Sequence, residues 1–146
     1  MEHYLLVRIL HSAPGVLLLL GLIAHGVMLF KAQRGGDATV LARKLRVTLL
    51  FSFPAFAVLA LSLPVTGYWL VDTAGWPLGQ TWLLLGSILY ALMMLLGLLL
   101  AGRLAVWRAL GDTPAPASLK RLCLIYAGLI LLLLIVIMAL MGAKPT

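Results

Sequence analysis

The hydrophobic positions of this chain fall into four long runs with polar segments between them. The runs cover residues 4–30, 47–71, 81–101 and 122–142. Each run is long enough to cross about 30 Å of hydrocarbon as a helix that rises about 1.5 Å per residue. Apolar residues are continuous within each run rather than alternating, which excludes the strands of a transmembrane barrel. Because lipid offers no hydrogen-bond partner to the backbone, all four runs are predicted to be helices.

The polar segments predict how these helices are oriented across the membrane. Nine of the eleven Lys and Arg residues fall in the first and third connections, residues 31–46 and 102–121. The second connection, residues 72–80, has no Lys or Arg. Since cytoplasmic loops carry the excess of basic residues, the first and third connections are expected in the cytoplasm. The chain is therefore predicted to be N-out and C-out, with both ends on the non-cytoplasmic side.

Composition agrees with a membrane protein and excludes a soluble one. The 146 residues are 64% hydrophobic and 10% charged, with a mean hydropathy of +1.14, whereas soluble domains are about half apolar and a quarter charged. The first run follows Glu2 and is longer than the apolar region of a secretory signal, so we expect it to be retained as a span. The prediction is an all-α, polytopic transmembrane four-helix bundle, forming a single domain over residues 1–146 in the bacterial inner (cytoplasmic) membrane.

The net charge of +7 changes this interpretation little. A basic chain can bind nucleic acid, but here the basic residues lie in two short loops between membrane spans, so no nucleic-acid partner is expected. The expected partners are the lipid bilayer and, as a homo-oligomer or a larger membrane complex, other protein chains. The one cysteine, Cys123, lies in an apolar run, which excludes an internal disulfide.

Only three ionisable residues lie inside the apolar runs, and all three are on the first helix: Arg8, His11 and His25. An ionised side chain at mid-bilayer costs about 2.5–3.5 kcal/mol even on the lenient insertion scale. Arg8 and His11 are three residues apart and share a helix face, and His25 points roughly the same way because it follows about four turns later. The two histidines are about 21 Å apart along the helix axis, which is too far to hold one metal ion together.

Counting from the centre of each span places His11 toward the outer side of the bilayer, at the level of Pro64 and Met138. Arg8 lies further out, at the level of Gly67, Trp82 and Met141. This layer predicts a haem b site with His11 as axial ligand to the iron, Met138 as a second axial ligand and Arg8 beside a propionate. The alternative is that Arg8 reaches up to the lipid headgroups and His11 forms a hydrogen bond across the bundle.

His25 is a fourth candidate for cofactor binding, at a different level of the membrane. Its expected neighbours at that level are apolar: Leu50, Leu99 and Leu124. A site at His25 would therefore need a second chain or a partner protein.

Three prolines bear on the shape of the spans, and the residue types and motifs that the chain lacks bear on its function. Pro14, Pro54 and Pro64 interrupt spans one and two and are expected to bend their helices. No Asp or Glu lies inside any run, whereas carriers coupled to protons or cations place a carboxylate in the membrane. The chain also lacks hydrolase and phosphate-loop motifs. It is therefore not expected to be an enzyme on its own.

Motifs around the second connection resemble a known family. They are Pro54, then Pro64-Val65-Thr66-Gly67-Tyr68-Trp69-Leu70, Gly75-Trp76-Pro77-Leu78 and Trp82-Leu83. In these segments the chain resembles a family of predicted four-span bacterial integral membrane proteins of unassigned function. The resemblance implies the fold for nearly the whole chain and implies no activity.

The first span is more distantly similar to two other bacterial families. His11 followed after nine residues by Gly21-Leu22 resembles the opening helix of HemJ-type protoporphyrinogen oxidases and of the copper resistance protein D family. The HemJ-type resemblance implies a haem-associated bundle in which the first-helix histidine, here His11, is essential. The chain departs from that family around Gly26, where Pro-Arg-Leu-Phe is expected, and has no lysine in span three. What remains implied is a haem-bearing or quinone-facing redox protein.

The working hypothesis is a bundle that binds haem b and serves a respiratory or haem-handling system through electron transfer. A second hypothesis is a non-catalytic accessory or assembly subunit, for which small-residue faces are available for helix contacts. These faces are Gly15, Gly21 with Ala24, Gly86 with Ser87, and Gly97 with Ala101. A third hypothesis, a small-solute transporter, would have only Ser52, Ser62, Thr66, Ser87 and Tyr90 to line a polar pathway.

Overall fold

The computed structural model describes residues 2–111 and 113–143, and the described residues form helices without any strand. The helices are α1 (Glu2–Arg34), α2 (Ala38–Val47), the π-helical turn η1 (Thr48–Ser52), α3 (Phe53–Ala74), α4 (Thr81–Ala109) and α5 (Ala117–Ala143). Because α2, η1 and α3 follow one another without a break, the described chain has four helices long and apolar enough to cross a membrane. The predicted all-α transmembrane bundle is confirmed.

Each helix is longer than the apolar run that predicted it. Helix α1 continues to Arg34 and α4 to Ala109, where the runs end at residues 30 and 101. Basic residues occupy the last turns of both helices, and such cations interact favourably with the carbonyl end of a helix dipole. The apolar run marks the part of each helix that lies in the hydrocarbon. The helix itself continues beyond this part into the headgroup region.

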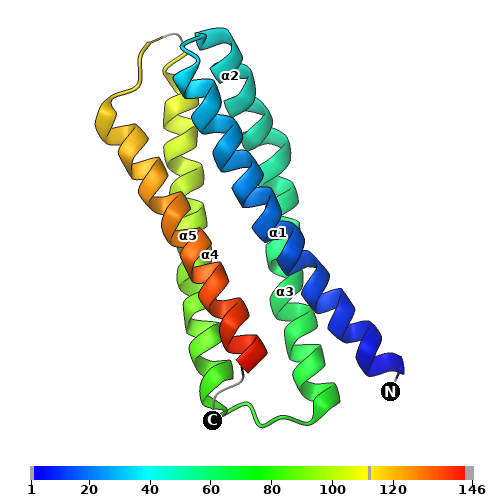
Figure 1. The fold of residues 1–146 in the computed structure, drawn as a ribbon. Coiled ribbons are helices and arrows are strands. Elements are labelled where there is room, and N and C mark those ends of the chain that lie inside the picture. The colour runs from blue at the N-terminus through cyan, green and yellow to red at the C-terminus, as the bar shows by residue number, and fades with distance from the viewer. Residues whose placement is uncertain (1, 112, 144–146) are drawn as a thin grey trace.

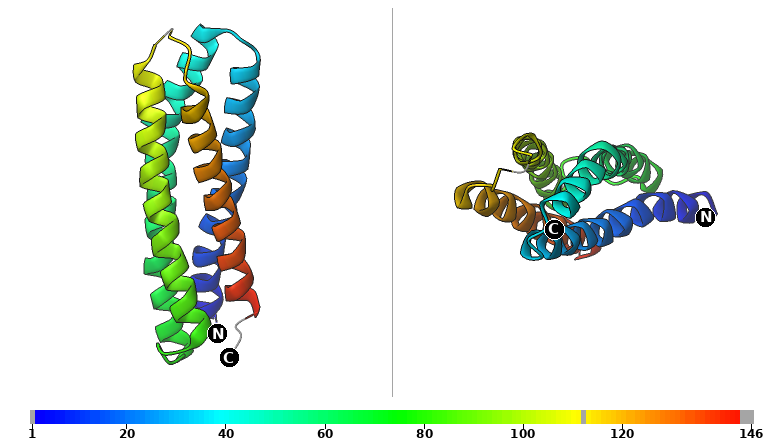
Figure 2. Two further views of the ribbon diagram at one scale, coloured as in Figure 1. Left: turned by 90° about the vertical axis from the view of Figure 1, so that its left-hand side faces the viewer. Right: turned by 90° about the horizontal axis from the view of Figure 1, so that it is seen from above.

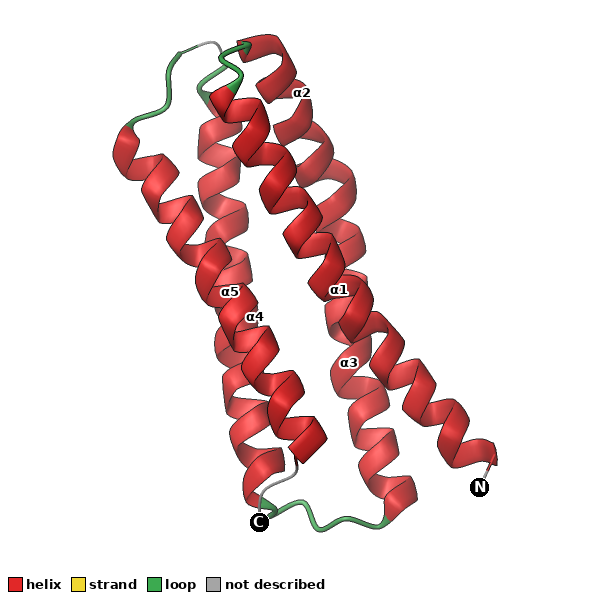
Figure 3. Cartoon of the chain, viewed as in Figure 1, coloured by secondary structure: helices red, strands yellow, loops and turns green. Residues whose placement is uncertain are grey.

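The spans form two antiparallel pairs, α1 with α3 and α4 with α5. In Figure 1 the α1–α2 and α4–α5 connections lie at one end of the bundle, and the α3–α4 loop lies at the other end with the beginning of α1. Figure 2 shows the same arrangement from two further directions, and Figure 3 shows that loops are confined to the two ends. We call the end with the α3–α4 loop the outer end and the opposite end the inner end, after the predicted orientation.

The two pairs pack unequally along their length. Helix α2 contacts α4 near the inner end, and the buried cluster there includes Leu45, Leu104 and Trp107. Toward the outer end α1 and α3 diverge from α4 and α5 (Figure 1). A smaller buried cluster of Val71, Trp82 and Leu83 packs at the outer end, so side chains fill the space between the pairs there as well.

Two glycines allow close contact between helices within the chain. A Cβ atom at Gly21 would lie 2.5 Å from Phe56 Cε1 and one at Gly86 would lie 2.6 Å from Met141 Cε, whereas one at Gly15 would make an ordinary contact, 3.7 Å from Leu63. These small-residue positions are thus used for packing inside the bundle. A Cβ at Gly97 would meet nothing within 4 Å, so that position remains open on the surface.

The prolines do not break the helices, and one of them follows a local change of helix type. Pro14 and Pro64 lie inside α1 and α3. Pro54 lies at the start of α3 directly after η1, where the Phe53 N–H donates to the Thr48 carbonyl five residues earlier. A proline ring clashes with the carbonyl four residues before it, and the wider π turn at that point relieves this crowding. The sequence predicted a disturbance at Pro54 but not its form.

The outer surface of the bundle is apolar. Large hydrophobic side chains such as Val58, Val65 and Leu98 are 69–72% exposed in the isolated chain. A soluble protein does not leave such a continuous apolar surface in water. The protein is therefore an integral membrane protein whose helices contact the lipid bilayer directly.

Candidate functional site

A cavity of about 430 Å³ lies between the two helix pairs in the outer half of the bundle. Its walls come from α1, α3, α4 and α5, and Trp76 of the α3–α4 loop lies at its outer rim. Most of its surface is apolar, and the polar side chains in its lining are few: Arg8, His11, Ser12, Tyr68, Trp76, Trp82, Ser87 and Tyr90. A largely apolar cavity with a few convergent polar groups is typical of a small-molecule site.

The cavity brings together three of the four residues singled out in the sequence. Arg8, His11 and Met138 all line it, from helices α1 and α5. Pro64, Gly67, Trp82 and Met141, which the sequence placed at the levels of His11 and Arg8, line it as well. His25 does not belong to the lining. His11 and His25 therefore differ in their surroundings as well as in their depth along the bundle.

The His11 ring is held against α3 by a chain of hydrogen bonds. His11 Nδ1 lies 3.0 Å from Thr66 Oγ1, and Thr66 Oγ1 donates its hydrogen to the Ser62 carbonyl at 2.8 Å. A hydroxyl has one hydrogen, so the Thr66 oxygen acts as the acceptor toward His11. With the Thr66 hydrogen on the Ser62 carbonyl, a neutral His11 donates from Nδ1. The Nε2 lone pair is left for a ligand, as in histidines that bind metals.

Gly67 provides the space for this contact. A Cβ atom at position 67 would lie 3.0 Å from His11 Cε1 and 3.5 Å from Nδ1. The imidazole thus rests directly against the backbone of α3, and any larger residue at position 67 would press on it. Gly67 and Thr66 together fix where the ring lies and how it is turned.

The opposite wall is tied to α3 by a tyrosine. The Tyr90 hydroxyl on α4 donates a hydrogen bond to the Ala60 carbonyl on α3. At the outer rim the rings of Trp76 and Trp82 meet edge to face, with centroids 5.4 Å apart. The cavity therefore has a polar cross-link on its inner side and an aromatic rim on its outer side.

The electrostatics of the lining favour an anion. Among the residues that the structure describes, Arg8 is the only charged one in the lining. An arginine in apolar surroundings gains most from a carboxylate or phosphate that accepts two hydrogen bonds. Arg8 is exposed in the isolated chain and no described lining residue is acidic, so its guanidinium can meet the acidic group of a ligand at the cavity.

His25 lies in a different environment in the inner half of the bundle. Its Nδ1 is 3.4 Å from Thr48 Oγ1, and its ring meets Phe56 edge to face with centroids 5.4 Å apart. The sequence placed apolar residues at its level and did not indicate Thr48. Those residues are exposed on the outside of the bundle: Leu50 at 45%, Leu99 at 42% and Leu124 at 67%.

Sequence reasoning missed three residues that shape the cavity. Thr66 and Tyr90 were considered as polar residues for a transport pathway, Thr66 and Gly67 as parts of a family motif, and Gly67 also as a residue at the level of Arg8; none was predicted to contact His11 or to tie α4 to α3. The sequence could have drawn attention to Thr66, because Thr66 and Thr48 are the two threonines of the predicted second span. In the part of the chain that the structure describes, no three His, Cys, Asp or Glu side chains form a metal-binding group. A metal held at His11 would need other ligands, such as those of a porphyrin.

Comparisons with known proteins bear on the fold and not on the cavity. No curated protein and no solved structure matches the chain. The distant likeness to HemJ-type and copper resistance protein D proteins thus rests on the first-helix pattern alone. A family model does match, over residues 5–145, with the description "Predicted integral membrane protein (DUF2269)". The four-span family of unassigned function suggested by the motifs around the second connection is confirmed, and the chain belongs to the DUF2269 family of integral membrane proteins.

Proposed function

We propose that this protein binds haem b in the outer cavity and serves as a redox component of the bacterial inner membrane. The observation that carries the proposal is the His11 ring, which is fixed through Nδ1 and shares its cavity with Arg8 and Met138. A histidine held through one ring nitrogen can ligate a metal through the other, and this would be its role toward haem iron. Haem b would supply one-electron chemistry that the side chains themselves lack.

The remaining features of the cavity fit the same ligand. Its volume of about 430 Å³ is within the range of roughly 300–1,000 Å³ for ligand pockets, and its apolar walls suit a porphyrin ring. Arg8 carries the charge that a propionate needs, and no lining carboxylate competes for it. Met138, on the α5 wall, is the candidate for the second axial position.

The first test is an optical spectrum of the purified full-length protein after expression with added haem precursor. A Soret band and a sharpened α band on reduction are expected, as for a haem held by two axial side chains. A protein that stays colourless under these conditions contradicts the proposal. If such a protein also co-purifies with one defined membrane partner, the accessory-subunit hypothesis is supported instead.

The hydrogen bond behind His11 predicts a second result. The substitution Thr66→Val keeps the shape of the side chain and removes the acceptor for Nδ1. Removing the outer partner of a ligating histidine typically weakens metal binding about 10- to 100-fold, so we expect a haem dissociation constant raised by about that factor, measured by titration of the apoprotein.

Ser62→Ala is the matched control for Thr66→Val. The Ser62 hydroxyl donates to the Leu59 carbonyl, whereas it is the Ser62 backbone carbonyl that accepts from Thr66. The alanine variant therefore keeps the chain of hydrogen bonds behind His11 and should bind haem like the parent. Equal haem affinity in Thr66→Val and Ser62→Ala would show that Thr66 does not support the ligand.

A further inference from the structure

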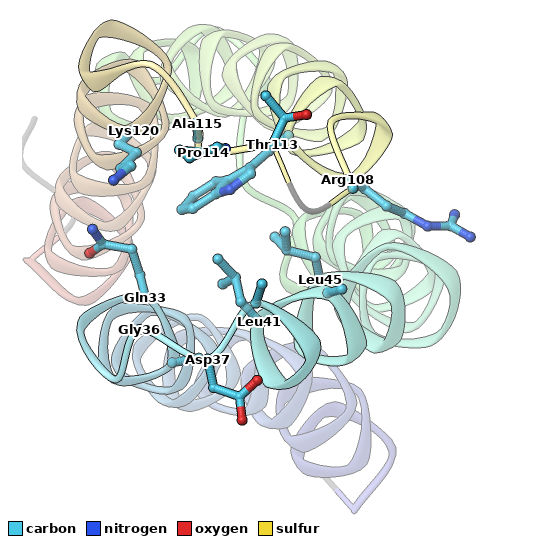
Figure 4. A pocket seen from close by; sticks show the side chains of 15 residues that line it. Gln33, Gly36, Asp37, Leu41, Leu45, Arg108, Thr113, Pro114, Ala115 and Lys120 are labelled. Atoms are coloured by element: carbon cyan, nitrogen blue, oxygen red, sulfur yellow. The ribbon is translucent and has the colours of Figure 1, made fainter.

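A second hollow, of about 300 Å³, lies at the opposite, inner end of the bundle. Figure 4 shows it between the end of α1, the start of α2 and the connection from α4 to α5. Its polar and aromatic lining residues are Gln33, Asp37, Trp107, Arg108, Thr113 and Lys120. It shares no residue with the outer cavity and has no part in the proposed haem site.

The charged side chains around this hollow are not equally directed into it. In Figure 4, Lys120 and Gln33 lie together on one side of the hollow, while Asp37 and Arg108 carry their charged groups away from it. Asp37 is already engaged, because its Oδ1 accepts from the backbone N–H groups of Thr39 at 3.0 Å and Val40 at 3.3 Å. Among the lining residues that the structure describes, Lys120 is therefore the cation that lies beside Gln33, and the one carboxylate, Asp37, is directed away.

The surroundings strengthen this positive field. The two connections at the inner end contain nine basic residues against two acidic ones, Asp37 and Asp112. Seven of the basic side chains are exposed on α1, α2, α4 and α5: Lys31, Arg34, Arg43, Arg46, Arg103, Arg108 and Arg121. A concentration of like charge around a hollow raises the local concentration of anions.

The depth of the hollow places it at the level of the lipid headgroups. Trp107, which is 9% exposed, lines it near the end of a membrane-spanning helix. Tryptophan at a span end lies at the level of the lipid headgroups. A lipid phosphate at that level reaches the hollow while its acyl chains stay against the apolar surface of the bundle.

We propose that this hollow is a binding site for the phosphate of an anionic phospholipid of the inner leaflet, with Lys120 as its main cation and Gln33 as a hydrogen-bond donor. Basic pockets between transmembrane helices on the cytoplasmic side commonly hold such headgroups. The site would fix the inner end of the bundle in one leaflet. The group that the site recognises is an anionic phosphate, and a free phosphate ion is the other source of such a group.

Native mass spectrometry of the full-length protein in detergent tests the proposal, with dioleoylphosphatidylglycerol and dioleoylphosphatidylcholine as probes. We expect at least one retained phosphatidylglycerol per chain at lipid concentrations that give no retained phosphatidylcholine. Lys120→Gln should weaken phosphatidylglycerol binding about fivefold, the effect of removing one basic residue near an anionic lipid surface. Lys44→Gln, which removes a lysine at the same end but outside the hollow, should leave the affinity unchanged.

Three outcomes would overturn the site. Equal retention of the two lipids would show that charge does not select the ligand. Equal loss in Lys120→Gln and Lys44→Gln would assign the effect to the general field of the basic end. Displacement of phosphatidylglycerol by equimolar inorganic phosphate would identify a soluble anion as the ligand. Because the readout is bound lipid, it is independent of whether the outer cavity binds haem.

Discussion

Replacing His11 by alanine is expected to abolish the Soret band that the parent protein shows after haem loading. The variant loses the one imidazole in the cavity lining, and Met138 alone offers only a thioether sulfur, a weak ligand. We expect haem retention to fall by more than tenfold, since even the loss of an outer partner of a ligating histidine costs about that much. The measurement is the ratio of Soret to protein absorbance after purification in parallel.

His25→Ala is the matched control for this variant. It removes an imidazole from the same helix, but from a position where the ring contacts Thr48 and Phe56 outside the cavity. Its Soret band should match that of the parent. Loss of haem in His25→Ala with retention in His11→Ala would reverse the assignment and place the ligand in the inner half of the bundle.

The depth of each residue could be predicted from the sequence, because a helix rises by a fixed amount per residue. Counting from the span centres placed Pro64 and Met138 at the level of His11, and all three line one cavity. The direction in which each side chain points could be predicted only on the first helix, where the rare ionisable residues mark a face. The other spans hold only scattered Ser, Thr and Tyr residues among apolar ones, so their sequences give a much weaker signal for the face turned to the bundle interior.

The contact between His11 and Thr66 shows the consequence of that weaker signal. The side of α3 that faces α1 depends on how the two helices pack. Gly67 leaves room for the His11 ring against α3, and this brings the ring to Thr66. The π turn at Thr48–Ser52 makes the facing residues of α3 harder still to predict, because the extra residue in this turn shifts the faces of α3 relative to those of α2. Neither feature follows from hydropathy, which only counts apolar residues.

The small residues illustrate the same limit. The sequence offered glycines on the spans as contact faces for partner proteins. Hydropathy does not distinguish a glycine that faces lipid from one that faces another helix. Gly21 and Gly86 turn out to contact side chains of their own chain, whereas Cβ atoms at Gly26 and Gly97 would meet nothing within 4 Å. The open glycines are the ones that a partner helix could still use.

The difference between these two kinds of glycine gives the largest expected effect on stability. Gly21→Leu places a side chain where a Cβ alone would be 2.5 Å from Phe56 Cε1 and 2.9 Å from Cζ. The Phe56 ring packs against His25 and Phe53, so it cannot move without disturbing the α1–α3 contact. We expect a loss of about 3 kcal/mol, near the upper end for overpacked cores, measured by thermal unfolding in detergent.

Gly26→Leu makes the same change on the same helix where the structure has room. Gly26 is exposed and a Cβ there meets nothing within 4 Å, and leucine favours a helix over glycine by roughly 0.8 kcal/mol. This variant should melt at or slightly above the temperature of the parent. Equal melting temperatures in the two leucine variants would mean that Phe56 moves aside at no cost, and that the α1–α3 contact is less tightly packed than the distances at Gly21 indicate.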